Sequence, residues 1–261
     1  MKVLIQLLIF IIPFYCIGQT PNDSINERIQ YLINKNCNTK ITKAEKDELR
    51  KFGYSIQNKG FNFVENNNDY LNALMPIDSA ISFWISIKDT ANEANLRKYK
   101  GMILGNLNRF DEGKQEINRA IGLYKTLNLD YGVAVSQFDM SQVLDLENSL
   151  DSALIYQKQA TEFWNIANDT FRIIVNNNHL IHLYCRLKDY TKAQEIQKLT
   201  ESMLMTDLHW NPTINFYFVS YNLFEETKKK DKADLFKKLY FKKLDALKNE
   251  GINAKSIYDK F

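Results

Sequence analysis

Glycine and proline are scarce in this chain of 261 residues, which has nine glycines and four prolines. A sheet protein of this size needs many tight turns, and tight turns draw on these two residues. Hydrophobic residues make up 45% of the chain and charged residues 25%, as in ordinary folded proteins. The composition argues against an all-β fold and wholesale disorder, and it excludes the collagen-like, mucin-like and disulfide-knot classes.

Strong net charge and glycine-rich catalytic motifs are also missing. The formal charge of +3 is too small to demand a nucleic-acid partner. The sequence has no Gly-x-Ser-x-Gly nucleophile elbow, no Walker A phosphate loop and no Gly-x-Gly-x-x-Gly dinucleotide motif. The adjacent Glu225 and Glu226 would point to different sides of a helix and are read as surface charge. We expect a non-catalytic protein without a cofactor.

The only long apolar run lies at the N-terminus. Met1-Lys2 is followed by a nearly unbroken apolar stretch from Val3 to Ile17, which has the length of a signal-peptide core and is short for a membrane span. Gly18 supplies the small residue needed before a cleavage site. The pattern predicts a signal peptide over residues 1–18, an extracytoplasmic (periplasmic or secreted) mature chain, and no membrane span after cleavage. An uncleaved anchor is an alternative.

Cysteine is rare, with three in the chain. Cys16 would be the lipidated residue of a lipoprotein, but the bulky Phe14 and Tyr15 precede it where lipoprotein signals have small residues, so this alternative is disfavoured. Cys37 and Cys185 remain after cleavage. They would either pair in an oxidising compartment or stay free, and two buried free thiols are the favoured interpretation.

An internal repeat with a period of 40 positions runs through the chain. Small residues recur at this interval, a second set follows seven positions later, and large residues precede the first set by nine positions. The three sets are Gly113, Ala153, Ala193 and Ala233; Ala120, Ala160, Thr200 and Tyr240; and Leu104, Leu144, Tyr184 and Phe224. Three coincident series indicate a true internal repeat.

Each repeat reads as two helices joined by a short polar turn. Residues 96–107 and 111–127 both carry apolar residues at three- and four-residue steps. Small residues at the contact would let paired helices approach closely. Aspartates at or near the starts of second helices would complement the helix dipole; they are Asp78, Asp111, Asp151 and Asp231.

A further unit precedes these four. The segment from Pro76 to Ala80 copies the start of a second helix. Ala80 precedes Gly113 by 33 positions, and this smaller interval predicts one shortened helix pair. The predicted organisation is a signal over residues 1–18, an N-terminal helical hairpin at 19–58 that is a degenerate repeat or cap, a repeat array at 59–250 and a capping segment at 251–261. The predicted fold class is all-α, an α–α superhelix of five to six helix hairpins.

The pattern resembles tetratricopeptide repeats. The resemblance rests on the three residue series and on the position held by Gly101, Ser141, Ile181 and Tyr221, which is small in the first two repeats. The family's late proline is absent and the period exceeds its usual 34. With the export signal and 28 asparagines, the chain also resembles extracytoplasmic sensor segments of Bacteroidetes-type signalling proteins.

The resemblance implies that the concave face of the first helices binds a protein or peptide. Transferring the concave positions gives Lys98, Met102, Phe138, Gln142, Asp145, Asn178, His182, Cys185, Phe218, Asn222 and Glu225 as candidate binding residues. Amides, charges and aromatic rings of this kind would hold an extended peptide. The main alternative to an interaction module is a sensor or accessory component that hands a signal to a membrane partner, and an enzyme with an unrecognised site is the third.

Two further groups of residues have simple explanations. His179, His182 and Cys185 lie three apart on a helix, and zinc binds both imidazole and thiolate, but the three side chains spread too widely for one ion, so no metal site is expected. The segment from Lys228 to Lys248 carries nine lysines against three aspartates. It would be a basic surface for anionic lipid, cell-wall polymer or nucleic acid, or simply a solvated terminal repeat, and the latter is favoured.

Overall fold

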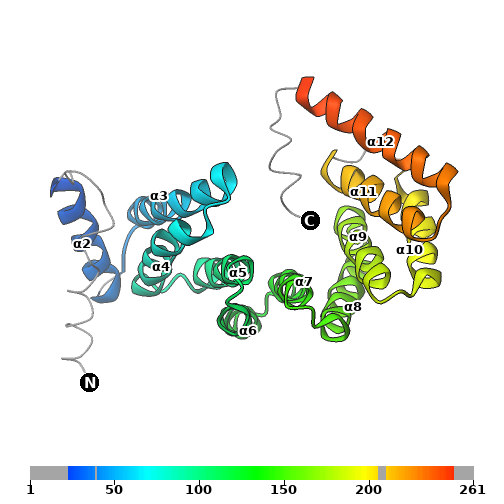
Figure 1. Cartoon of the computed structure of the whole chain (residues 1–261). Coiled ribbons are helices and arrows are strands. Elements are labelled where there is room, and N and C mark those ends of the chain that lie inside the picture. The colour runs from blue at the N-terminus through cyan, green and yellow to red at the C-terminus, as the bar shows by residue number, and fades with distance from the viewer. Residues whose placement is uncertain (1–22, 39, 205–209, 250–261) are drawn as a thin grey trace. The chain divides into compact units, whose positions relative to one another are not determined.

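The computed structural model describes residues 23–38, 40–204 and 210–249. Within these residues the chain forms eleven helices and no strand (Figure 1). They are α2 (Asp23–Asn38), α3 (Lys43–Asn67), α4 (Tyr70–Ser86), α5 (Thr90–Asn106), α6 (Phe110–Thr126), α7 (Asp130–Leu146), α8 (Leu150–Ala167), α9 (Thr170–Arg186), α10 (Tyr190–Met203), α11 (Trp210–Glu226) and α12 (Lys230–Asn249). The all-α expectation is therefore confirmed, and no described helix is long and apolar enough to cross a membrane.

The helices from α4 onward begin 20 positions apart, so two helices make one repeat of the predicted period. In the described turns from α3 to α10 and in the turn between α11 and α12, one residue has positive φ, and these residues recur at multiples of the same interval: Asn68, Lys88, Asn108, Asn128, Asn148, Asn168, Lys188 and Lys228. Asparagine tolerates this left-handed conformation better than most residues. The turn at Asn108 closes with the amide of Arg109 donating to the carbonyl of Leu104 at 2.8 Å. The abundance of asparagine thus has a partly structural cause.

Aspartates cap the starts of four helices, but they are not the aspartates that the sequence pattern indicated. Asp69, Asp89, Asp169 and Asp189 each accept a hydrogen bond from the backbone amide three residues later. Three of the predicted residues lie within first turns, whereas Asp78 lies in the middle of α4. The prediction for Asp78 was wrong because the true cap, Asp69, lies further toward the N-terminus.

Consecutive helices pack as hairpins, with first helices α3, α5, α7, α9 and α11 and second helices α4, α6, α8, α10 and α12. The closest approach in α5–α6 involves two glycines. A Cβ added to Gly113 would lie 2.8 Å from the carbonyl oxygen of Gly101. In α7–α8 the equivalent contact is a hydrogen bond from the hydroxyl of Ser141 to the carbonyl of Ala153, at 2.8 Å. Small residues therefore permit close helix contact, as the repeat predicts.

The first full repeat has the same length as the others. Ala73 and Ala80 of α4 are both fully buried, and they precede Gly113 and Ala120 by one full period. The prediction of a shortened helix pair was wrong because it matched Ala80 to Gly113 instead of to Ala120. Pro76 consequently lies inside α4 and not at its start. The expected division between residues 58 and 59 falls inside α3, which pairs with α4.

The chain divides into two compact units, Met1–Leu129 and Asp130–Phe261. In the first unit, α2 packs against the α3–α4 hairpin around the fully buried Trp84, with Leu32 and Ile77. In the second unit, one cluster surrounds Trp164 and another surrounds Phe216. The expected signal at 1–18 and cap at 251–261 lie outside the described residues.

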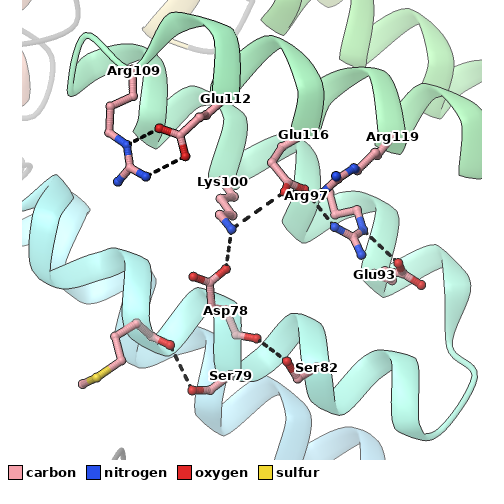
Figure 2. Close-up of polar contacts among 11 residues, drawn as sticks. Asp78, Ser79, Ser82, Glu93, Arg97, Lys100, Arg109, Glu112, Glu116 and Arg119 are labelled. Carbon is pink, nitrogen blue, oxygen red and sulfur yellow. Dashed lines mark hydrogen bonds and ion pairs between the residues drawn. The ribbon is translucent and has the colours of Figure 1, made fainter.

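A charged network joins α4, α5 and α6 within the first unit (Figure 2). Glu116 is 7% exposed. Its carboxylate accepts from Arg97 at 2.9 Å and from Arg119 at 2.9 Å. Lys100 lies 3.8 Å from the same carboxylate and 2.6 Å from Asp78. Three cations therefore compensate one buried carboxylate, and Lys100 ties it to α4.

Candidate functional site

The candidate residues all lie on first helices. Lys98 and Met102 lie on α5 in the first unit, and both are half-buried. The other nine lie in the second unit: Phe138, Gln142 and Asp145 on α7; Asn178, His182 and Cys185 on α9; Phe218, Asn222 and Glu225 on α11. Since one helix pair fills one period of the repeat, equivalent positions recur in register from one first helix to the next.

Asp145 is the centre of a polar cluster between α7 and α9. The Nε2 atoms of His179 and His182 lie 3.3 Å and 3.2 Å from the same carboxylate atom, Oδ2 of Asp145. The two imidazole rings are stacked, with centroids 6.1 Å apart. The three-residue spacing of the histidines on α9 brings both rings to one face of the helix. One buried carboxylate thus organises two histidines.

Arg186 completes the cluster at the last turn of α9. Its guanidinium donates to Oδ1 of Asp145 and, at 2.8 Å, to the backbone carbonyl of the same residue. Its second terminal nitrogen donates to the side chain of Asn148 at 2.7 Å. Asn148 is the positive-φ residue in the turn after α7. The arginine therefore fixes both the carboxylate and the adjacent turn.

Helix α8 contributes a buried glutamine that contacts His179 and stabilises the cluster. Oε1 of Gln157 on α8 lies 2.9 Å from Nδ1 of His179. The amide nitrogen of Gln157 donates to the backbone and side-chain oxygens of Asn176 at 3.0 and 2.9 Å. Gln157 is completely buried, so these contacts replace the water that its amide would otherwise bind. Both ring nitrogens of His179 therefore have a polar partner, Gln157 at Nδ1 and Asp145 at Nε2.

The cluster's charges follow from its burial and its hydrogen bonds. Burial by itself would raise the pKa of Asp145, but the hydrogen bonds from His179 and His182 outweigh it and hold that pKa well below its usual range. Burial lowers the pKa of His179, and this effect exceeds the opposing influence of Asp145. The site therefore places an ionised carboxylate beside a buried imidazole whose charged form is disfavoured by burial.

The structure brings some candidates together and leaves others apart. Phe138 meets His179 edge to face at 5.6 Å, so it joins Asp145 and His182 in one cluster. Gln142 and Asn222 are half-buried and Glu225 is exposed. These residues and His182, whose side chain is 33% exposed, are the more accessible candidates in this unit.

Three candidates serve packing. Asn178 is buried and donates to the carbonyl of Pro212 at 2.8 Å, joining α9 to the start of α11. Cys185 lies in the hydrophobic cluster of the second unit, where burial, aided by the charge of Glu226, raises the pKa of its thiol to about 12. The Phe218 ring packs against Tyr240 of α12 at 5.5 Å.

Sequence reasoning missed the role of Gln157 and considered His179 only as a metal ligand. A signal for Gln157 existed, since the equivalent positions one and two periods earlier hold the fully buried Ile117 and Ile77. A buried polar residue at a position that is apolar in the two preceding repeats needs a buried polar partner. His179, on the next helix, is that partner.

Known structures share this arrangement of helices. No family model matches the sequence, and no curated protein matches it. The structure is similar to that of BtubC (BKLC) from P. vanneervenii, with a TM-score of 0.62, 12% identity, and coverage of 86% of this chain and 92% of that chain. It is also similar to Rap protein complexed with competence and sporulation factor, with a TM-score of 0.65, 14% identity, and coverage of 92% of this chain and 68% of that chain.

The chain has a tetratricopeptide-like helical repeat fold. The likeness to Rap and the series of hairpins in both units carry this conclusion. At 12% and 14% identity the likeness extends to the fold alone, because folds host many functions.

Proposed function

We propose that the protein is a non-catalytic interaction module that binds a protein or peptide on the first-helix surface of its second unit. The observation that carries the proposal is the cluster of Asp145, His182 and Arg186. It holds partly exposed polar groups from two first helices in fixed positions, beside the ring of Phe138. Fixed groups lose little conformational freedom on binding, which favours affinity.

The surface offers complementary contacts for an extended chain. Gln142 and Asn222 occupy equivalent positions on α7 and α11, and His182 occupies the same position on α9. Side-chain amides both donate and accept hydrogen bonds, so they suit the alternating N–H and C=O groups of a peptide backbone. The repeat would thus present one polar contact per first helix. The complex of Rap with competence and sporulation factor supports binding by this kind of fold.

The proposal includes export. The apolar stretch from Val3 to Ile17 and the small Gly18 support a signal peptide and an extracytoplasmic site of action. Mass spectrometry of the chain purified from the envelope or the medium would test this, with an N-terminus at Gln19 as the expected result. A chain found in the cytosol with Met1 intact would contradict export.

Affinity capture with matched variants tests the binding surface. The bait is the tagged chain, captured from envelope fractions, beside Gln142→Arg and Asn222→Arg variants and a control, Glu162→Arg, on second helix α8. Gln142 and Asn222 are only half-buried, so these changes leave the packing intact. We expect the first two variants to recover at least tenfold less partner than the unchanged chain, and the control to recover the same amount. Equal recovery by all variants would contradict the assigned surface.

A further inference from the structure

The positive charge of the chain is concentrated in α12. This helix contains seven lysines and three aspartates, a net charge of +4, whereas the whole chain carries +3. The rest of the chain therefore has a net charge of −1. A positive charge that is concentrated on one helix points to a role for that surface and not to general solubility.

One face of α12 packs against the protein and the other faces outward. Phe236, Tyr240, Leu244 and Leu247 are buried. The opposite face carries exposed lysines, the exposed Asp234 and Asp245, and two large apolar residues, Phe241 at 49% and Leu235 at 52% exposed. We call Lys237, Lys238, Phe241, Lys242 and Lys248 the basic face. The ring of Phe241 meets the ring of Tyr240 at 5.4 Å and leaves about half of its side chain accessible for contact with a partner.

The lysines of α12 that contact α11 or an aspartate differ from those at the middle of this face. Lys237 lies over the ring of Tyr221 at 5.6 Å, and Lys232 lies over the ring of Phe224 at 5.1 Å, so their stems cover α11. Lys248 lies 3.8 Å from Asp245. Lys238 and Lys242 are exposed one helical turn apart on the outer side. They bracket Phe241 and present their charges to a partner.

We propose that the basic face of α12 binds an anionic lipid surface, with Phe241 entering the headgroup layer and the lysines contacting lipid phosphates. A helix with cations and an exposed aromatic residue on one side suits the plane of a membrane interface. The helix holds no arginine. Lysine is a point charge that needs no fixed geometry, whereas reading of bases in nucleic acid relies on arginine and amide forks. The face therefore fits lipid better than nucleic acid.

Vesicle co-sedimentation of the full chain tests this proposal. The probes are vesicles of phosphatidylcholine alone and vesicles in which phosphatidylglycerol replaces about one third of the phosphatidylcholine, at physiological salt. We expect at least tenfold tighter binding to the anionic vesicles, and loss of that difference in K238E/K242E. The control K51E/K59E replaces two exposed lysines of α3 and alters the net charge by the same amount. It should retain the preference for anionic vesicles. Phe241→Ala should weaken anionic binding several-fold and leave its salt dependence in place.

Each other outcome overturns the proposal. Binding that is equal on both vesicles and unchanged in K238E/K242E would reflect the apolar N-terminal stretch and not α12. Equal loss in both double variants would reflect net charge alone. Tighter binding to a DNA duplex than to anionic vesicles, lost in K238E/K242E, would assign the face to nucleic acid. Thermal unfolding of each variant checks that the fold is retained.

Discussion

The Nε2 atom of His182 lies 3.2 Å from Oδ2 of Asp145, on the preceding first helix. The Nε2 atom of His179 lies 3.3 Å from the same oxygen. These two contacts, with the guanidinium of Arg186, leave Asp145 an ionised group that is nearly enclosed by the protein. The cluster therefore both joins α7 to α9 and gives their accessible side a polar character.

The first prediction concerns the charge of Asp145. Asp145→Asn keeps the shape but removes the charge that compensates Arg186, so it leaves a partly buried cation without its partner. We expect the free energy of unfolding to fall by about 2–3 kcal/mol. Urea unfolding measures it, with Glu162→Gln as the control that should change little. Unchanged stability in Asp145→Asn would show that the cluster does not hold the two helices together.

The second prediction concerns pH. Burial lowers the pKa of His179 in the folded state, so the unfolded chain binds more protons than the folded chain as the pH falls below about 6.5. Stability should therefore decrease from pH 7 to pH 5. In His179→Gln this decrease should be smaller, because the buried titrating group is gone. Asp145 acts only at lower pH, since the stabilisation from its lowered pKa is lost below about 4. Urea unfolding midpoints at pH 7, 6 and 5 compare the wild-type chain with the variant. The same change of midpoint with pH in both would contradict the prediction.

The third prediction concerns the network of Figure 2. Glu116→Gln would leave Arg97, Arg119 and Lys100 without the buried carboxylate between them. We expect a loss of about 2 kcal/mol, below the range for a fully buried pair because the cations are partly exposed. Glu112→Gln, which breaks an exposed pair with Arg109 at the N-cap of the same helix, is the control and should have little effect. Equal effects would show that burial of Glu116 is irrelevant.

The fourth prediction compares two glycines. A Cβ at Gly101 would lie 2.4 Å from Cγ1 of Ile117 and 2.8 Å from the carbonyl oxygen of Gly113. Gly101→Ala should therefore destabilise the first unit by about 2 kcal/mol. A Cβ at Gly122, in the exposed part of α6, would meet nothing within 4 Å, so Gly122→Ala should stabilise by about 0.5–1 kcal/mol. Thermal unfolding of both variants checks the opposite signs, and equal signs would refute the packing explanation.

The repeat could be predicted from sequence because it rests on small buried residues at a constant interval. Gly113, Ala153, Ala193 and Ala233 are all buried in the structure. The first repeat was misaligned because Ala73 and Ala80 are both small, so either could be matched to Gly113. The constant interval resolves the match, because Ala73 and Ala80 precede Gly113 and Ala120 by one full period, and the helix ends at Asn68 and Lys88 agree with it.

The candidate site was only partly predictable for a different reason. Asp145 and His182 were found because their repeat positions lie on the first-helix surface. His179 and Gln157 were not assigned to the site, because their function depends on one side chain meeting another from a separate helix. Conversely, Asn178 and Cys185 occupy predicted surface positions but are buried, since α11 packs against this part of α9.

Site-specific photo-crosslinking shows directly whether a partner lies on the first-helix surface of the second unit. A photoreactive residue is placed at Gln142 on first helix α7 or at Glu162 on second helix α8, and the chain is irradiated in living cells that express it. We expect a discrete crosslinked adduct from position 142 that is lost when Asp145→Asn is added, and no such adduct from position 162. Adducts of equal yield from both positions, or from position 162 alone, would contradict binding on the first-helix surface.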